Sequence, residues 1–170
     1  MDGYTYNDGG RAAAGFKGST GDCVVRSIAI ATGKPYIEVY DTVNELAQDE
    51  RPRNGKKRSN ARNGVWRKSY QRYLESLGWE WVPTMTIGSG CKVHLVASEL
   101  PSGRIICRLS KHLCAVIDGV IHDTFDSRRD VHTIESDHGQ DLKPGQLRNQ
   151  NGVCSIQRRC VYGYFRQVAA

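Results

Sequence analysis

The amino-acid sequence predicts an α+β fold, with helices in the first half of the chain and an antiparallel sheet in the second. Two observations support this prediction: apolar residues recur at helical spacing as far as Leu77, and after Gly103 they form short β-rich runs between turn residues. A chain of 170 residues is long enough to bury a sizeable core. We therefore expect one domain over residues 1–170, with residues 1–20 as an N-terminal arm and residues 51–64 as a basic loop.

The first expected helix covers residues 22–32 and carries Cys23 in its first turn. Its body is apolar almost all round, because Arg26 and Ser27 are its only polar side chains. A helix of this kind is normally buried on every side. Gly33 then supplies the left-handed residue with which helices commonly end.

Two more helices are expected before the sheet begins. Pro35 suits the first turn of the second helix, whose core face is formed by Tyr36, Tyr40, Val43 and Ala47. The basic loop follows this helix. A third helix then carries an apolar stripe from Trp66 to Leu77 and ends at Gly78.

The second half of the chain is predicted to form strands connected by turns. We expect a strand from Trp79 to Met85 and a short helix from Val93 to Leu100, closed by Pro101. Further strands are expected at Arg104–Leu109, His112–Ile117, Val120–Phe125 and Arg159–Val168. Residues 126–156 are polar and show no period, so we expect a long loop there.

The dipeptide Asp118-Gly119 is a strong signal for a two-residue hairpin turn, which fixes the pairing of the strands beside it. The predicted pairs are Ile117 with Val120, Val116 with Ile121 and Ala115 with His122. Continued along the strands, this register places His112 opposite Phe125, with Asp123 diagonally adjacent on the same face. A one-residue change in the turn would reassign the faces and make Asp126 the alternative neighbour of the histidine.

Cys23 follows the turn-forming pair Gly21-Asp22 and stands at the start of a buried helix. The free N–H groups and the positive dipole end there favour a thiolate and can also hold an oxyanion. A cysteine nucleophile further needs a histidine to accept its proton and an acid to orient that histidine. We therefore predict Cys23, His112 and Asp123 as the catalytic residues. The alternative for Cys23 is a small apolar residue packed at a helix start.

This order of Cys23 at the head of a buried helix, His112 opening a strand and an acid early in the next strand resembles the papain-like cysteine peptidase superfamily. The branch it resembles most is the peptidases that process bacteriocin leaders, and the specific similarity covers residues 15–32 and 104–126. The chain is also similar to small uncharacterised proteins of bacteriophages and prophages with a Gly-Asp-Cys-Val start and a histidine–hairpin–aspartate segment.

The resemblance implies a papain-like fold, in which the nucleophile helix packs on the C-terminal antiparallel sheet. It also implies a cysteine-dependent hydrolase or acyl transferase that acts on a peptide or isopeptide bond of a protein or peptide substrate, without a cofactor. A phage-encoded protein of this kind would act in the bacterial host. Deamidases, transglutaminases and acetyl-transfer enzymes use the same three groups, so the sequence leaves the reaction type open.

The chain departs from the papain-like pattern just before the nucleophile. Papain-like enzymes commonly have a glutamine there that donates to the oxyanion, and residues 15–22 contain none. Lys17, Ser19 and Thr20 are the candidate side-chain donors, beside the backbone N–H of Cys23. Loss of an oxyanion donor costs on the order of 10²–10³ in rate, so an inactive relative of the family is a second interpretation.

The net charge of +6 is concentrated in residues 51–74, which hold nine basic side chains and no acidic one. Such a segment can bind nucleic acid or an acidic partner, with Lys56, Lys57, Arg58 and Arg62 as candidate contacts and Trp66 and Tyr70 available to stack on bases. The alternative is a solvated loop whose aromatic residues face the core. The second candidate function is therefore a non-catalytic accessory protein that binds a host protein or nucleic acid through this loop.

The six cysteines are expected to be reduced, because no secretory leader opens the sequence. We expect Cys107, Cys114 and Cys160 in core strands and Cys91 and Cys154 in loops. Although Cys91-Lys92-Val93-His94 has a two-residue spacing, no Cys-x-x-Cys pair exists, so we expect no metal site. No apolar run approaches the roughly 20 residues of a membrane span, so we expect no membrane partner. Reduced thiols and the lack of a leader predict a cytoplasmic location, in the host if the protein is phage-encoded.

Overall fold

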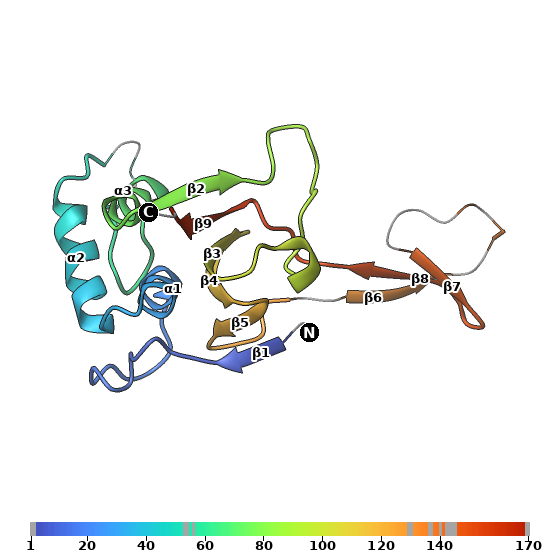
Figure 1. The fold of residues 1–170 in the computed structure, drawn as a ribbon, viewed down its shortest axis with the longest axis horizontal. Helices are drawn as coiled ribbons and strands as arrows, with labels where there is room; N and C mark the ends of the chain where they lie inside the picture. The colour runs from blue at the N-terminus through green and yellow to red at the C-terminus, as the bar shows by residue number, and fades with distance from the viewer. Residues whose placement is uncertain are drawn as a thin grey trace.

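The computed structural model describes residues 3–52, 55, 57–128, 131–135, 138–139, 141 and 146–168. Three α-helices lie on one side of a six-stranded sheet, and a three-stranded sheet projects from the other side (Figure 1). The expected α+β class is confirmed. None of the helices in these ranges has the length and apolar character that crossing a membrane requires.

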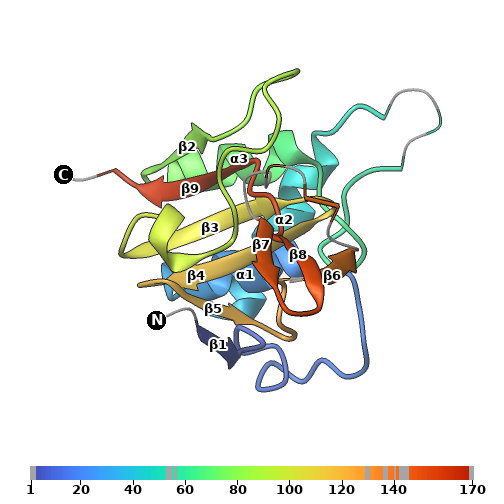
Figure 2. The ribbon, with the colours of Figure 1, turned by 90° about the vertical axis from the view of Figure 1, so that its right-hand side faces the viewer.

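The helices are α1 (Cys23–Thr32), α2 (Tyr36–Gln48) and α3 (Arg67–Ser76), and they lie behind the sheet when it is viewed from its opposite face (Figure 2). Their ends follow the predicted signals. Gly33 closes α1 with a φ of 74°, Pro35 directly precedes α2, and Gly78 follows α3 with a φ of 78°. From Val24 to Ala31 α1 is buried, so this prediction is also confirmed.

The six-stranded sheet has the order β1-β5-β4-β3-β9-β2 and is antiparallel except for the β1–β5 pair. Its strands are β1 (Gly3–Tyr6), β2 (Trp79–Pro83), β3 (Arg104–Leu109), β4 (His112–Ile117), β5 (Val120–Asp123) and β9 (Gly163–Gln167). The hairpin register is confirmed, because Ala115 pairs with His122 and the two closer pairs also form as predicted. Both turn residues adopt positive φ, 49° at Asp118 and 80° at Gly119.

Two regions that we expected to be irregular contain strands. The N-terminal arm includes β1, which pairs in parallel with β5. Residues 126–156 contain β6 (Val131–Glu135), β7 (Gln146–Asn149) and β8 (Gly152–Gln157), joined in the order β6-β8-β7. The partner of β1 lies in the distant half of the chain, and the small sheet is rich in polar residues, so neither region shows a local hydrophobic period.

Two other predictions were wrong in type or extent. The segment Val93–Leu100 is not an α-helix and contains only the single 3₁₀ turn η1 (Ala97–Glu99). The last strand is shorter than the predicted Arg159–Val168. Both differences have one cause, because backbone hydrogen bonds join residues 93–95 to residues 159–161 and draw both segments out of their expected elements.

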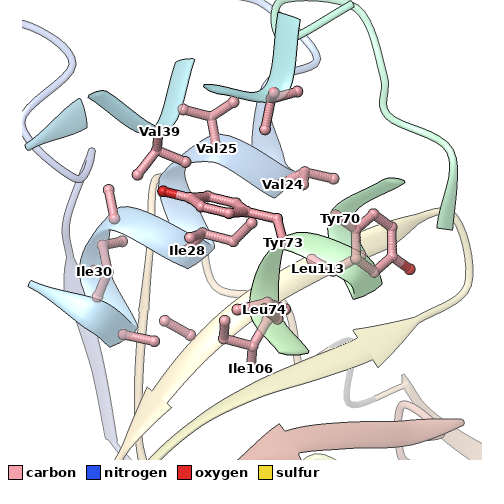
Figure 3. Close-up of a cluster of buried hydrophobic side chains, with 14 of the residues drawn as sticks. Val24, Val25, Ile28, Ile30, Val39, Tyr70, Tyr73, Leu74, Ile106 and Leu113 are labelled. Carbon is pink, nitrogen blue, oxygen red and sulfur yellow. The ribbon is translucent and has the colours of Figure 1, made fainter. Parts of the chain in front are cut away.

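The sheet is buried on both faces. On the helix side, apolar residues of all three helices pack on Ile106 of β3 and Leu113 of β4 (Figure 3). On the other side, Cys107 and Cys114 pack with Leu95 and other apolar residues of a second cluster. Because α1 and β4 both lie inside this packing, the residues at their starts are held in fixed positions.

The expectation that all thiols are reduced is wrong for Cys91 and Cys160, which form a disulfide bond. Cys160 lies before β9, in the segment that pairs with residues 93–95, and this pairing brings the two cysteines together. Cys154 lies in β8 and not in a loop. Cys107 and Cys114 are buried in the core as predicted.

Candidate active site

Cys23 is the first residue of α1 and lines a cleft of about 470 Å³. It is half-buried, so its sulfur is neither sealed in the core nor fully in solvent. The N–H groups of a first helical turn have no acceptor within the helix, and they therefore remain available to an anion in the cleft. The position expected for a nucleophile is thus also an accessible one.

His112 opens β4 and lies in the same cleft, with only 9% of its surface exposed. Its Nε2 atom donates a hydrogen bond to Oδ2 of Asp123 over 2.5 Å. The thiol of Cys23 lines the same cleft, close enough to the imidazole for each group to shift the pKa of the other, and Nδ1 is the ring nitrogen that remains for this contact. The ring of Phe125 packs on the imidazole with the centroids 5.0 Å apart, although the paired part of the hairpin ends before it. The three residues predicted from the sequence are therefore brought together in one site.

The environment of Cys23 and His112 favours a thiolate–imidazolium pair. Burial raises the pKa of Cys23, but the hydrogen bond and the charge of His112, followed by smaller effects of the Leu113 N–H and of Arg26, bring it below its ordinary value. Burial lowers the pKa of His112, but the hydrogen bonds to Asp123 and Cys23 and their charges raise it to about 9. Each member of the pair thus stabilises the charged form of the other.

Asp123 is held as an ionised acceptor behind the imidazole. Burial raises its pKa, but the hydrogen bond and charge of His112, the Thr124 N–H and the Ser127 hydroxyl lower it to a value below the ordinary one. The Thr124 N–H donates to Oδ1 over 2.7 Å and the Ser127 hydroxyl to Oδ2 over 3.0 Å. The alternative acid Asp126 is exposed and pairs with Arg128 over 2.5 Å, so it does not orient the histidine.

A buried network of charges behind the site was missed by the sequence analysis. Asp22, which is 1% exposed, accepts a hydrogen bond from the Tyr36 hydroxyl over 2.6 Å and pairs with Arg11 over 3.0 Å. Arg26 also bonds to Asp22, and its Nη2 atom lies 3.5 Å from Oδ1 of Asp123. Arg26 therefore links the residue before the nucleophile to the orienting acid. The available signal was the spacing of an acid and a base four residues apart on a buried helix, where each needs a partner.

The three candidate oxyanion donors differ in their positions. The Thr20 hydroxyl reaches the cleft but donates to the carbonyl of Arg62 over 2.6 Å. Ser19 lines a neighbouring hollow, and Lys17 is exposed and lines neither space. Among the described residues that line the cleft, Asn63 supplies the single carboxamide side chain. It comes from a loop distant in sequence, so no pattern before Cys23 could reveal it.

The end of the basic loop, at Asn63 and Gly64, lines this cleft, but the candidate basic side chains of the loop that the structure describes lie outside it. Lys57, Arg58 and Arg62 are exposed and do not line it. The Nε atom of Arg58 donates to the carbonyl of Glu50 over 3.2 Å. Lys56 lies outside the described residues. Nucleic-acid or acidic-partner binding by these four basic residues stays a prediction.

Three other basic residues line the cleft: Arg67 of α3, Arg108 of β3 and Lys111 of the turn between β3 and β4. The sequence analysis counted Arg67 only as part of the basic segment and did not single out the other two. They come from separate parts of the chain, and only the packing of α3 against the sheet gathers them. No local pattern could therefore identify them as a group.

Comparisons with protein-family models, with curated proteins and with solved structures found no match for this chain. The resemblance to papain-like peptidases therefore stays a prediction. In the part of the chain that the structure describes, no group of three or more His, Cys, Asp or Glu side chains is placed to hold a metal ion. Any function is accordingly inferred from the geometry of the cleft.

Proposed function

We propose that this protein is a papain-like cysteine hydrolase that cleaves a peptide or isopeptide bond by acyl transfer to water. The observation that supports this most is that Cys23 and His112 line one open cleft, with the imidazole hydrogen-bonded to Asp123 over 2.5 Å and near enough to the thiol to lower its pKa. The fold agrees with a papain-like arrangement, since the nucleophile begins a buried helix that packs on a mainly antiparallel sheet.

In the first half of the reaction, the Cys23 thiolate attacks the carbonyl carbon of the scissile bond. The carbonyl electron pair moves to oxygen, and the N–H groups at the start of α1 stabilise the resulting oxyanion. The Asn63 amide is the side chain in the cleft that supplements them. When the oxyanion collapses, the C–N bond breaks and the leaving amine takes the proton of the His112 imidazolium. The products of this half are a thioester on Cys23 and a free amine.

In the second half, water attacks the thioester and the neutral His112 accepts its proton. Collapse of the second oxyanion breaks the C–S bond and releases the carboxylic acid. The sulfur leaves as a thiolate beside the newly formed imidazolium, so the starting ion pair is restored. Asp123 keeps Nε2 protonated throughout, which directs Nδ1 toward the sulfur and the substrate.

Cleavage of an unbiased, proteome-derived peptide library tests this proposal without a known substrate. The wild-type protein should generate new amino termini that mass spectrometry detects, and Cys23→Ala and His112→Ala should not. Equal sets of termini from the wild type and Cys23→Ala would refute the proposal. A Cys107→Ala variant is the matched control, because it removes a thiol of the core that lies outside the cleft.

A second candidate function is supported by the surface between α2 and α3. A hollow of about 460 Å³ there is lined by three basic residues, Arg51, Lys68 and Arg72, together with the partly buried Trp66 and two acidic residues, Asp49 and Glu50. Cations around an exposed aromatic edge can hold a single-stranded nucleic acid. In that case binding of an oligonucleotide should weaken steeply with salt and with Lys68→Gln, and Cys23→Ala should leave it unchanged.

A further inference from the structure

The cleft that contains Cys23 is strongly cationic. Of the described residues that line it, Arg26, Arg67, Arg108 and Lys111 are basic and none is a carboxylate. Arg26 is already engaged by Asp22 and Asp123. The other three take part in no ion pair among the described residues, so they face the cleft with their charge uncompensated.

Aromatic rings hold the two guanidinium groups without neutralising them. The guanidinium carbon of Arg67 lies 4.5 Å from the centre of the Trp81 ring, and that of Arg108 lies 5.6 Å from the centre of the Tyr162 ring. Such stacking orients a guanidinium while its N–H donors stay free for a ligand. A planar pair of donors of this kind matches a carboxylate.

Tyr70 connects these two cations to the nucleophile. Its ring is buried at the edge of the helix-side core, and its hydroxyl points away from the centre of that cluster (Figure 3). Burial raises the pKa of this hydroxyl, and the positive charges of Arg108 and Arg67 oppose the rise. Tyr70, the two arginines and Cys23 all line the same cleft.

We propose that the cleft recognises a carboxylate next to the carbonyl that Cys23 attacks, with Arg67 and Arg108 as the residues that bind it. This inference rests on the proposed hydrolase function and names its substrate class, an acidic peptide. The carboxylate belongs either to an Asp or Glu side chain or to the C-terminus of the substrate. A nucleic acid fits the charge but offers no acyl carbon to the thiolate, so the peptide is favoured.

The peptide library tests this recognition when the double variant Arg67→Gln/Arg108→Gln is compared with the wild type. Wild-type cleavage sites should be enriched in Asp and Glu or should lie next to peptide C-termini, and the variant should cleave such peptides at least tenfold more slowly while other sites are unaffected. Amidated copies of the cleaved peptides separate the two sources, because only a C-terminal carboxylate is removed by amidation. Arg158→Gln makes one of the same charge changes outside the cleft and should behave like the wild type. Cleavage sites that are neither enriched in acidic residues nor next to a free C-terminus would overturn the inference and leave the hydrolase standing.

A second measurement does not depend on turnover. Iodoacetate and iodoacetamide both alkylate a thiolate with loss of iodide, but only iodoacetate carries a carboxylate. The rate of alkylation by iodoacetate divided by the rate by iodoacetamide should be on the order of tenfold higher at Cys23 than for free glutathione. In the double variant this rate ratio should fall to the glutathione value. An unchanged ratio in the double variant would overturn carboxylate recognition, as would protection of Cys23 by an oligonucleotide but not by acidic peptides. If the double variant lowered the rate ratio but the wild type cleaved no peptide, carboxylate recognition would be supported and the hydrolase function refuted.

Discussion

Three free thiols whose side chains the structure describes lie in two contrasting regions. Cys107 and Cys114 face each other across β3 and β4 and are completely buried, whereas Cys23 lies at the cleft. Burial acts in the same direction on all three and raises the pKa of each thiol. For Cys107 and Cys114 the pKa is raised, but at Cys23 the hydrogen bond and charge of His112 outweigh burial. The neighbouring imidazole therefore distinguishes the one thiol whose pKa is lowered from two thiols whose pKa is raised.

Single substitutions at Cys23, His112 and Cys107 are expected to show the largest difference between the two regions. Cys23→Ala should abolish cleavage, and His112→Ala should reduce it by about 10²–10⁴-fold because general base catalysis is lost. Cys107→Ala should leave the cleavage rate unchanged and cost about 1 kcal/mol of unfolding free energy, the usual effect of a small core truncation. The comparison would be wrong if the core variant lost activity while remaining folded.

The next largest effect is expected from Arg26, which compensates the charges behind the site. Arg26→Met should lower the free energy of unfolding by about 3–5 kcal/mol, because it leaves Asp22 and Asp123 buried with less positive charge. Urea denaturation followed by circular dichroism measures this change. A change below about 1 kcal/mol would show that the network is not needed for the fold.

A smaller effect is expected from the two cysteines that are not free. Replacement of both Cys91 and Cys160 by serine should reduce the unfolding free energy by about 2–4 kcal/mol, since the disulfide closes a long loop. The rate of Cys23 alkylation should not change, because neither residue lines the cleft. Mass spectrometry of the unreduced protein checks the disulfide itself, and free thiols at both positions would contradict the structure.

The parts of the fold that the sequence could predict are those with local causes. Asp118-Gly119 determines the hairpin by its own backbone preferences, and this one turn is enough to bring Asp123 to His112. The position of α1 followed in the same way from its apolar circumference and from Gly33. The three predicted site residues depended only on these short elements.

The remaining features depend on contacts between distant segments. β1 pairs with β5, and residues 93–95 pair with residues 159–161. Because the partner segments are far apart in the sequence, neither pairing could be predicted from the residues next to β1 or next to residues 93–95. The same holds for Arg108, which reaches the cleft because β3 packs beside α3. The disulfide bond between Cys91 and Cys160 also results from the pairing of residues 93–95 with residues 159–161. The spacing of the cysteines in the sequence does not indicate this pairing.

The measurement that tests the central claim most directly is the pH dependence of Cys23 alkylation by iodoacetamide, followed by mass spectrometry. Because the pKa of Cys23 is lowered, its thiolate should persist at a lower pH than that of an ordinary thiol and disappear only as the pH falls through the lowered value. Because the pKa of His112 is raised to about 9, the pairing with its imidazolium should be present at lower pH and lost as the pH rises through that value. In His112→Ala the profile of Cys23 should move to that of an ordinary or buried thiol. Identical profiles in the wild type and His112→Ala would contradict the account.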